Sequence, residues 1–278
     1  CKAKLNIDLS NFTTPVAAKD FEAVRVALGY KGFHLYGVSY GTRIAQEYMR
    51  QFPNAVLTST LDGVVPMQQS LAAIGGAVDG SLAALFKRCE TDALCAAQYP
   101  NLANNFNSLL TRLEQQPVQT QVRHPRTNDL IDFTITKMKL YSAIRFALYG
   151  HAQRAIVPMV IEKALRGDYS PLAGMMANVD LTQSLAMGMH NAIVCGEDWP
   201  RLTTQTRAQY SKTYMGKAMI AGLDIACPIL NVKAVDETFY QPLKTSTPTL
   251  LLSGGRDPAT PASWAELAMV EMTNATHL

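Results

Sequence analysis

The stretch FHLYGVSYGTRIAQEYM, residues 33–49, decides the fold. A run of β-forming residues stops at GVSYG (37–41), and a helical pattern starts at once. Gly-x-Ser-x-Gly between a strand and a helix is typical of a nucleophile elbow, a tight turn that lifts a serine hydroxyl clear of the sheet. We therefore predict that Ser39 is a nucleophile and that the backbone N–H of Tyr40 faces the developing oxyanion. An ordinary glycine-rich turn is the alternative.

The tight turn is expected to require glycine at both flanking positions. We expect side chains at Gly37 or Gly41 to collide with the neighbouring strand or helix, because the turn is tight. The serine between them is expected to hold a strained backbone conformation.

Strands and helices alternate on both sides of this stretch. We expect strands at 33–37, at 55–66, at 247–261 and from residue 275, with helices at 14–30, 43–51 and 263–272. This alternation predicts an α/β fold with a mostly parallel sheet that is covered by helices on both faces.

The middle of the chain differs in character from its ends. Between residues 67 and 245 it is rich in Ala, Leu, Met and Gln at helical spacing, and LIDFTITKMKL (130–140) is expected to add a short strand or hairpin. We predict that 67–245 is a mostly helical cap inserted into an α/β core formed by 1–66 and 246–278.

Composition and charge exclude several classes of protein. The chain has 278 residues, of which 48% are hydrophobic and 17% are charged, and its net charge is +3. No basic block points to nucleic acid or to an anionic membrane surface. No apolar run approaches the roughly 18–20 residues of a membrane span.

Five cysteines are informative by their spacing. Cys89 and Cys95 bracket the short polar loop ETDAL and could close a small ring, whereas Cys195 and Cys227 lie in the same middle region. A metal site fits poorly, because there is no CxxC and no His at ligand spacing. We expect two disulfides and an oxidising compartment. Free thiols in a cytosolic protein are the alternative, and Cys1 is left without an assigned partner.

An acid that supports the serine should follow it in the chain, at the end of a later strand. Asp257 in LLLSGGRDPATP fits, because it comes after an apolar strand in a Gly- and Pro-containing loop. Asp62, which ends the strand directly after the elbow, is the competitor, although an Asp before Gly is more often a turn residue.

Three segments together resemble one family. LYGVSYGTRIAQEYMRQFP, LDGVVP and LLLSGGRDPATPASWAELA look like the prolyl and tripeptidyl aminopeptidases, which are secreted α/β-hydrolases, and GMHNAIVCGEDWPR looks similar too. The resemblance runs over essentially the whole chain. It implies an α/β-hydrolase fold with a helical cap, a secreted or periplasmic location, and no cofactor or metal. It also implies an exopeptidase that releases Pro or short peptides through an acyl-enzyme.

The resemblance further implies acidic cap residues that bind the α-ammonium of a peptide with a free N-terminus. In this sequence that role falls to Glu197, with Asp198 as a second candidate. A solvated loop beside a disulfide is the alternative for both residues.

Two other functions remain open at this point. A carboxylesterase or lipase would share the triad but use an apolar acyl pocket, for which cap methionines are candidates: Met175, Met176, Met187 and Met189. A non-catalytic binding protein or inactive fragment is the second alternative, because the sequence lacks parts of the expected catalytic machinery.

The family pattern predicts more chain than residues 1–278 provide. About 32 residues precede the elbow strand, and no HGGP-like loop for a second oxyanion N–H is found there. We therefore expect a chain that is truncated at both ends and lacks the triad histidine. His277 falls at a strand position of the family, and the remaining histidines fit the role less well: His34, His124, His151 and His190.

Overall fold

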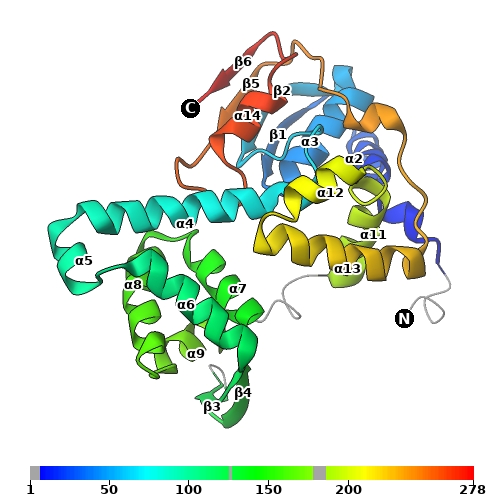
Figure 1. Cartoon of the computed structure of the whole chain (residues 1–278). Helices are drawn as coiled ribbons and strands as arrows, with labels where there is room; N and C mark the ends of the chain where they lie inside the picture. The colour runs from blue at the N-terminus through cyan, green and yellow to red at the C-terminus, as the bar shows by residue number, and fades with distance from the viewer. Residues whose placement is uncertain (1–6, 125–126, 178–185) are drawn as a thin grey trace. The chain divides into compact units, whose positions relative to one another are not determined.

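In the computed structural model, which describes residues 7–124, 127–177 and 186–278, four strands form one parallel sheet. The strands are β1 (Phe33–Val38), β2 (Val56–Asp62), β5 (Thr249–Leu252) and β6 (Ala275–His277). Their order across the sheet is β1-β2-β5-β6 (Figure 1). Val38 pairs with Asp62, and Asp62 pairs with Leu252, so the C-terminal ends of three strands lie at one edge. The predicted parallel sheet is confirmed, and this edge is where α/β proteins place their sites.

Three helices belong to the same layer structure. They are α2 (Thr14–Ala27), α3 (Tyr40–Gln51) and α14 (Ala262–Ala268). The helix α3 buries Tyr48 and Met49 against Leu61 of β2 and Leu251 of β5. Burial of these apolar side chains is the main favourable contribution to folding of this core, and it fixes α3 against the sheet directly after the elbow.

The chain divides into two compact units. The first combines residues 1–77 with 186–278, and the second consists of residues 78–185. The predicted insertion, 67–245, contains the whole second unit together with segments on either side of it.

Several further helices complete the first unit. They are η1 (Leu9–Phe12), η2 (Pro53–Ala55), η3 (Leu71–Ala73), α11 (Met187–Glu197), α12 (Thr204–Tyr210), α13 (Tyr214–Leu230) and η4 (Glu237–Tyr240). The helices α11 and α13 share a buried cluster that includes Val194, Ile220 and Leu223. A disulfide between Cys195 and Cys227 joins the two helices inside this cluster. The end of α11 is thereby fixed covalently.

The second unit is mostly helical, as predicted. The helix α4 (Ile74–Thr91) begins in the first unit and is followed by α5 (Ala93–Gln98), α6 (Leu102–Gln115), α7 (Lys137–Ala147), α8 (His151–Leu165) and α9 (Ser170–Ala177). An antiparallel hairpin of β3 (Val118–Arg123) and β4 (Leu130–Ile135) confirms the strand predicted within 130–140.

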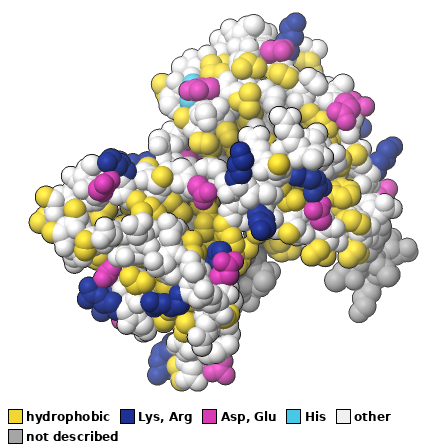
Figure 2. Space-filling model, viewed as in Figure 1, with side chains coloured by type: hydrophobic (Ala, Val, Ile, Leu, Met, Phe, Trp, Pro, Cys, Tyr) yellow, Lys and Arg dark blue, Asp and Glu magenta, His cyan; other side chains and the backbone are white. Residues whose placement is uncertain are grey.

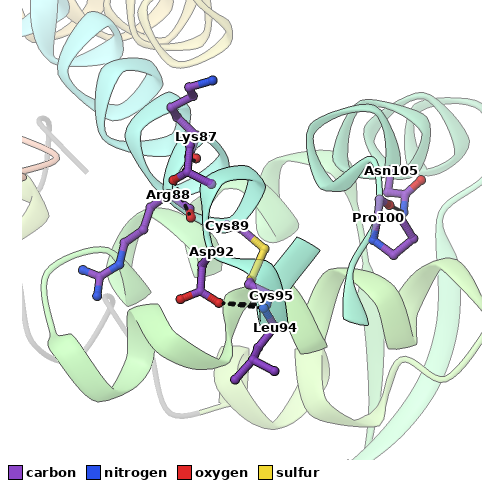
Figure 3. The surroundings of a disulfide bond; sticks show 9 residues. Lys87, Arg88, Cys89, Asp92, Leu94, Cys95, Pro100 and Asn105 are labelled. Carbon is purple, nitrogen blue, oxygen red and sulfur yellow. Dashed lines mark hydrogen bonds between the residues drawn. A yellow bond between two sulfur atoms is a disulfide. The ribbon is translucent and has the colours of Figure 1, made fainter. Parts of the chain in front are cut away.

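The second disulfide, between Cys89 and Cys95, closes the predicted small ring between α4 and α5 (Figure 3). Asp92 begins α5 by accepting hydrogen bonds from the backbone N–H groups of Leu94 and Cys95, at 3.1 and 2.9 Å. Such a cap satisfies helix donors that have no partner within the helix. Cys1 lies outside the described residues.

Basic and acidic side chains are interspersed on the face of the molecule shown in Figure 2, and neither sign forms a continuous block. This distribution agrees with the small net charge of +3. No helix in the described part of the chain combines the length and the apolar character that crossing a membrane requires.

Candidate active site

Ser39 occupies a strained position between β1 and α3. Its backbone has φ 53° and ψ −120°, a conformation that non-glycine residues rarely adopt, and its side chain is exposed. The serine is therefore placed as the sequence predicts for an elbow: at the C-terminal end of a strand, before the first turn of a helix.

The two glycines of the turn differ in what they do. A Cβ built on Gly37 would lie 2.5 Å from the carbonyl oxygen of Gly41, so position 37 has no room for a side chain. A Cβ built on Gly41 would meet nothing within 4 Å. The expectation that a side chain at Gly41 collides is wrong. The backbone of Gly41 lies close to position 37, but a side chain on Gly41 would point into open space.

Hydrogen bonds to the neighbouring strand and to the following helix fix the conformation of this turn. The N–H of Ser39 donates to the carbonyl oxygen of Asp62 at 2.9 Å, and the carbonyl oxygen of Ser39 accepts from the hydroxyl of Thr42 at 2.6 Å. Tyr40 is the first residue of α3, where a backbone N–H has no acceptor within the helix. The positive end of the helix dipole lies at the same point, so an anion beside Ser39 would be stabilised.

Asp257 lies in the loop after β5, at the same edge of the sheet as Ser39. Its Oδ1 accepts from the N–H groups of Ala259 and Thr260 at 2.8 and 3.0 Å, and its Oδ2 accepts from the Thr260 hydroxyl at 2.8 Å. A Cβ built on Gly63 would lie 3.7 Å from that Oδ2, so the carboxylate sits against the end of β2. The loop thus presents a fixed carboxylate two strands away from β1, with β2 between them.

The competing acid, Asp62, is engaged elsewhere. Its Oδ2 accepts a hydrogen bond from the hydroxyl of Tyr36 at 2.9 Å. Tyr36 projects from β1 and is 65% exposed, so this pair lies on an open part of the sheet. Bonding to Asp62 raises the pKa of the Tyr36 hydroxyl above its ordinary value.

Two of the histidines are strand residues that contact other side chains. His277 is a residue of β6, as its strand position predicts, and its Nε2 is 2.9 Å from the hydroxyl of Ser253. His34 lies in β1 and contacts Thr58 through Nδ1 at 2.8 Å. Among the described residues, no hydrogen bond of Ser39 or Asp257 involves a histidine.

Glu197 ends α11 and is fully buried. Its Oε1 accepts from the backbone N–H of Thr14 at 2.6 Å. Its Oε2 lies 3.7 Å from Nη1 of Arg43 and has no hydrogen-bond partner among the described residues. Burial raises the pKa of Glu197 to about 7, although Arg43 and the Thr14 N–H oppose the rise. One oxygen of this carboxylate is therefore available to a donor.

Asp198 is also buried, but its oxygens are occupied. Its Oδ2 lies 3.1 Å from Nη1 of Arg43, and its Oδ1 accepts from Leu71 N–H at 2.8 Å and from Arg201 at 2.9 Å. Burial alone would raise the pKa of Asp198, but the two arginines outweigh it and hold that pKa below its usual range. Asp198 thus lies in a network of its own that favours its ionised form.

Thr14 connects this acidic pair to the elbow. Its hydroxyl lies 2.6 Å from the hydroxyl of Tyr40, and its N–H bonds Glu197. Burial, together with the nearby Glu197 carboxylate, raises the pKa of Tyr40. Sequence reasoning missed Thr14 and Arg43. No local signal pointed to Arg43, because the apolar residues of this helix lie on the side opposite to it.

The methionines that the esterase alternative invoked lie in both units. Met176 of α9 is buried, whereas Met187 and Met189 on α11 are 44% and 49% exposed. No described group of three or more His, Cys, Asp or Glu side chains could hold a metal ion.

Two family profiles match the chain. The family described as alpha/beta hydrolase fold matches residues 2–119, and the family described as TAP-like protein matches residues 211–278. The first match contains the elbow, and the second contains Asp257.

Two kinds of curated relative align with the chain. A tripeptidyl aminopeptidase of Streptomyces lividans is 25% identical over 266 residues, which cover 91% of this chain and 48% of the relative. The serine protease Hip1 of Mycobacterium tuberculosis is 44% identical over 57 residues, 20% of this chain and 11% of Hip1. The chain thus spans about half the length of the aminopeptidase relative.

A solved structure of a thermophilic esterase from Thermogutta terrifontis aligns with 95% of this chain and 62% of that chain. The sequence identity is 15% and the TM-score is 0.34.

Proposed function

Because the chain belongs to the tripeptidyl aminopeptidase-like family of α/β-hydrolases, we propose that it is a serine aminopeptidase that releases Pro or short peptides from free peptide N-termini. The observation that carries the proposal is the backbone of Ser39, with φ 53° and ψ −120° and an exposed side chain at the end of β1. Strain of this kind is kept where a reactive group must be presented.

In this proposal the Ser39 hydroxyl oxygen attacks the carbonyl carbon of the scissile peptide bond. The serine proton passes to a general base, and the negative charge on the former carbonyl oxygen is stabilised by the N–H of Tyr40 at the start of α3. The base returns the proton to the leaving amine as the C–N bond breaks. Water then attacks the acyl-enzyme by the same route and restores the serine.

Asp257 orients the base and stabilises its protonated form. Its carboxylate is already fixed by two backbone N–H groups and one hydroxyl, so it offers a rigid acceptor. We propose that the base is none of the five histidines. His277 and His34 are strand residues bonded to other side chains, and the other three belong to the predicted cap segment, 67–245.

Glu197 is the proposed anchor for the substrate's α-ammonium. Its free Oε2 and the link through Thr14 to Tyr40 place an unpaired acceptor close to the elbow. Since Glu197 is fully buried, the proposal requires that the partly exposed Tyr40 gives way when substrate binds. A charge-assisted hydrogen bond in such a place contributes roughly 1.5–3 kcal/mol.

The two disulfides fit an oxidising compartment. We propose that the protein works outside the cytoplasm, as a secreted or periplasmic enzyme, with peptides as substrates and no cofactor.

Labelling with a fluorophosphonate and peptide turnover test the proposal together. The intact protein that contains this chain should label at Ser39, and its Ser39→Ala variant should neither label nor turn over peptides. An esterase would label equally well but would cleave neutral esters without preferring a free N-terminus. Absence of labelling in the folded intact protein would exclude both hydrolases and favour a non-catalytic binding protein.

A further inference from the structure

We propose that Arg43 is a positioning residue that makes Glu197, and not Asp198, the receptor for the substrate's ammonium group. The inference rests on the proposed function, since it concerns how the same amine anchor is built. Arg43 lies four residues after Ser39 on α3, so it joins the anchor to the helix that begins at the nucleophile.

The guanidinium of Arg43 is buried and shared unequally between the two acids. Its side chain is 2% exposed, and Nη1 lies 3.1 Å from Asp198 Oδ2 but 3.7 Å from Glu197 Oε2. Nη2 donates to the carbonyl oxygen of Gln69 at 2.7 Å, which fixes the plane of the group. Arg43 therefore gives its hydrogen bond to Asp198 and offers Glu197 only a charge.

The two carboxylates therefore differ in whether they can accept a further hydrogen bond. Asp198 is bonded by Arg43, Arg201 and the Leu71 N–H, so both of its oxygens are occupied. Glu197 has one donor, the Thr14 N–H, and retains a free oxygen. An ammonium has three protons to donate and no acceptor, so it can bind Glu197 without displacing an existing bond.

The groups around Glu197 determine when it is charged. It faces Thr14 from α2, Tyr40 and Arg43 from α3, its neighbour Asp198 directly after α11, and Tyr240 from η4. Of these described groups, Arg43 alone is cationic. Asp198, by contrast, adds a negative charge that disfavours ionisation of Glu197. Arg43 thus keeps the anchor ionised at a pH where a peptide α-amino group, with a pKa near 7.7–8.0, is still protonated.

The pH profile of kcat/KM separates this role from a purely structural one. We would measure it for a peptide with a free N-terminus and for p-nitrophenyl acetate, since the ester reports the catalytic base without the anchor. Arg43→Gln should move the acidic limb of the peptide profile upward by about one pH unit, a loss of about fivefold at pH 7 that approaches tenfold at lower pH. The limb for the ester should stay in place.

A second variant tests the same idea with the opposite sign. Asp198→Asn is nearly isosteric and leaves Arg43 with Glu197 as its remaining anion, so the acidic limb for the peptide should move downward by half a pH unit or more. Arg201→Lys serves as the control, because Arg201 contacts Asp198 and not Glu197. The acidic limb of the peptide profile should not move in this variant. Arg43→Gln and Asp198→Asn are independent tests, so if one variant fails to fold, the other still tests the role of Arg43.

The outcomes separate the inference from the proposed function. If the wild-type protein prefers free over N-acetylated peptides but neither Arg43→Gln nor Asp198→Asn moves the peptide limb, the role of Arg43 is overturned and the aminopeptidase stands. Equal movement of the peptide and ester limbs also overturns it. If the wild-type protein shows no preference for a free N-terminus, the proposed function itself fails.

Discussion

The backbone N–H of Thr14 lies 2.6 Å from Oε1 of Glu197, across 183 residues of sequence. This buried hydrogen bond joins the start of α2 to the end of α11. The adjacent hydroxyl of Thr14 contacts Tyr40, the residue after Ser39. The proposed anchor is therefore connected to the nucleophile elbow through one residue, Thr14.

Replacing Glu197 by Gln should harm only substrates with a free N-terminus. Loss of roughly 1.5–3 kcal/mol of charge-assisted binding corresponds to about a 10- to 150-fold fall in kcat/KM. Hydrolysis of p-nitrophenyl acetate should change little, because this ester has no ammonium. N-acetylation of the peptide should slow the wild type and add little to the mutant. Equal losses on peptide and ester would exclude the anchor role.

The same substitution should stabilise the protein in a pH-dependent way. Glu197 has a raised pKa of about 7 in the folded state against 4.5 for the free group, so its burial as an anion opposes folding above pH 7. The penalty develops as pH rises from 4.5 to about 7 and corresponds to about 3 kcal/mol. Urea unfolding should show Glu197→Gln more stable than wild type at pH 8, with the difference vanishing near pH 4.5. A difference that is the same at both pH values would contradict the assignment.

Strain at Ser39 predicts two contrasting substitutions. Ser39→Ala should abolish turnover with the melting temperature nearly unchanged, because alanine adopts φ 53° no more easily than serine. Ser39→Gly should abolish turnover and be more stable than Ser39→Ala by about 1 kcal/mol, since glycine relieves a strain of about 1–3 kcal/mol at some cost in unfolded-state entropy. Calorimetry of the two variants makes the comparison, and a less stable glycine variant would argue against strain.

The glycines of the elbow provide a matched pair. Gly37→Ala should destabilise the protein by about 1–3 kcal/mol, because the new Cβ would lie 2.5 Å from the Gly41 carbonyl oxygen. Gly41→Ala should alter stability by less than about 1 kcal/mol, because its Cβ enters open space on a helix. Urea midpoints of both variants test this, and equal destabilisation would mean that the turn is packed differently.

The acid of the triad can be identified by comparing two aspartates. Asp257→Asn should lower kcat by several orders of magnitude, by analogy with other triads in which this change costs about 10⁴-fold. Asp62→Asn should reduce kcat by less than about tenfold, because its partner is the exposed Tyr36 hydroxyl. Steady-state kinetics on one peptide is sufficient, and the reverse ranking would move the assignment to Asp62.

Local sequence pattern was enough to predict the core of the fold. Strand β1, the turn at Ser39 and helix α3 follow from adjacent residues, and the later strands follow from short apolar runs before Gly or Pro. The ring of Cys89 and Cys95 was also predictable, because six positions of separation nearly fix the geometry of a small loop.

Contacts between distant segments could not be predicted from the same pattern. The helix expected over 14–30 is present as α2, but its apolar residues Phe21 and Val24 are about half exposed, and the helix buries Thr14 and Ala18 instead. The partners of Glu197 come from α2 and α3, and no local periodicity encodes which distant segment a buried carboxylate meets. The same holds for Arg43, whose bond to Asp198 spans 155 residues.

The free oxygen of Glu197 also affects the enthalpy measured when an ammonium group binds. With a pKa near 7, this carboxyl is about half protonated in a neutral solution. An ammonium that docks on it favours the ionised form, so docking expels protons into the solvent. The heat recorded by titration calorimetry at pH 7 should therefore depend on the ionisation enthalpy of the buffer, and should differ between phosphate and Tris.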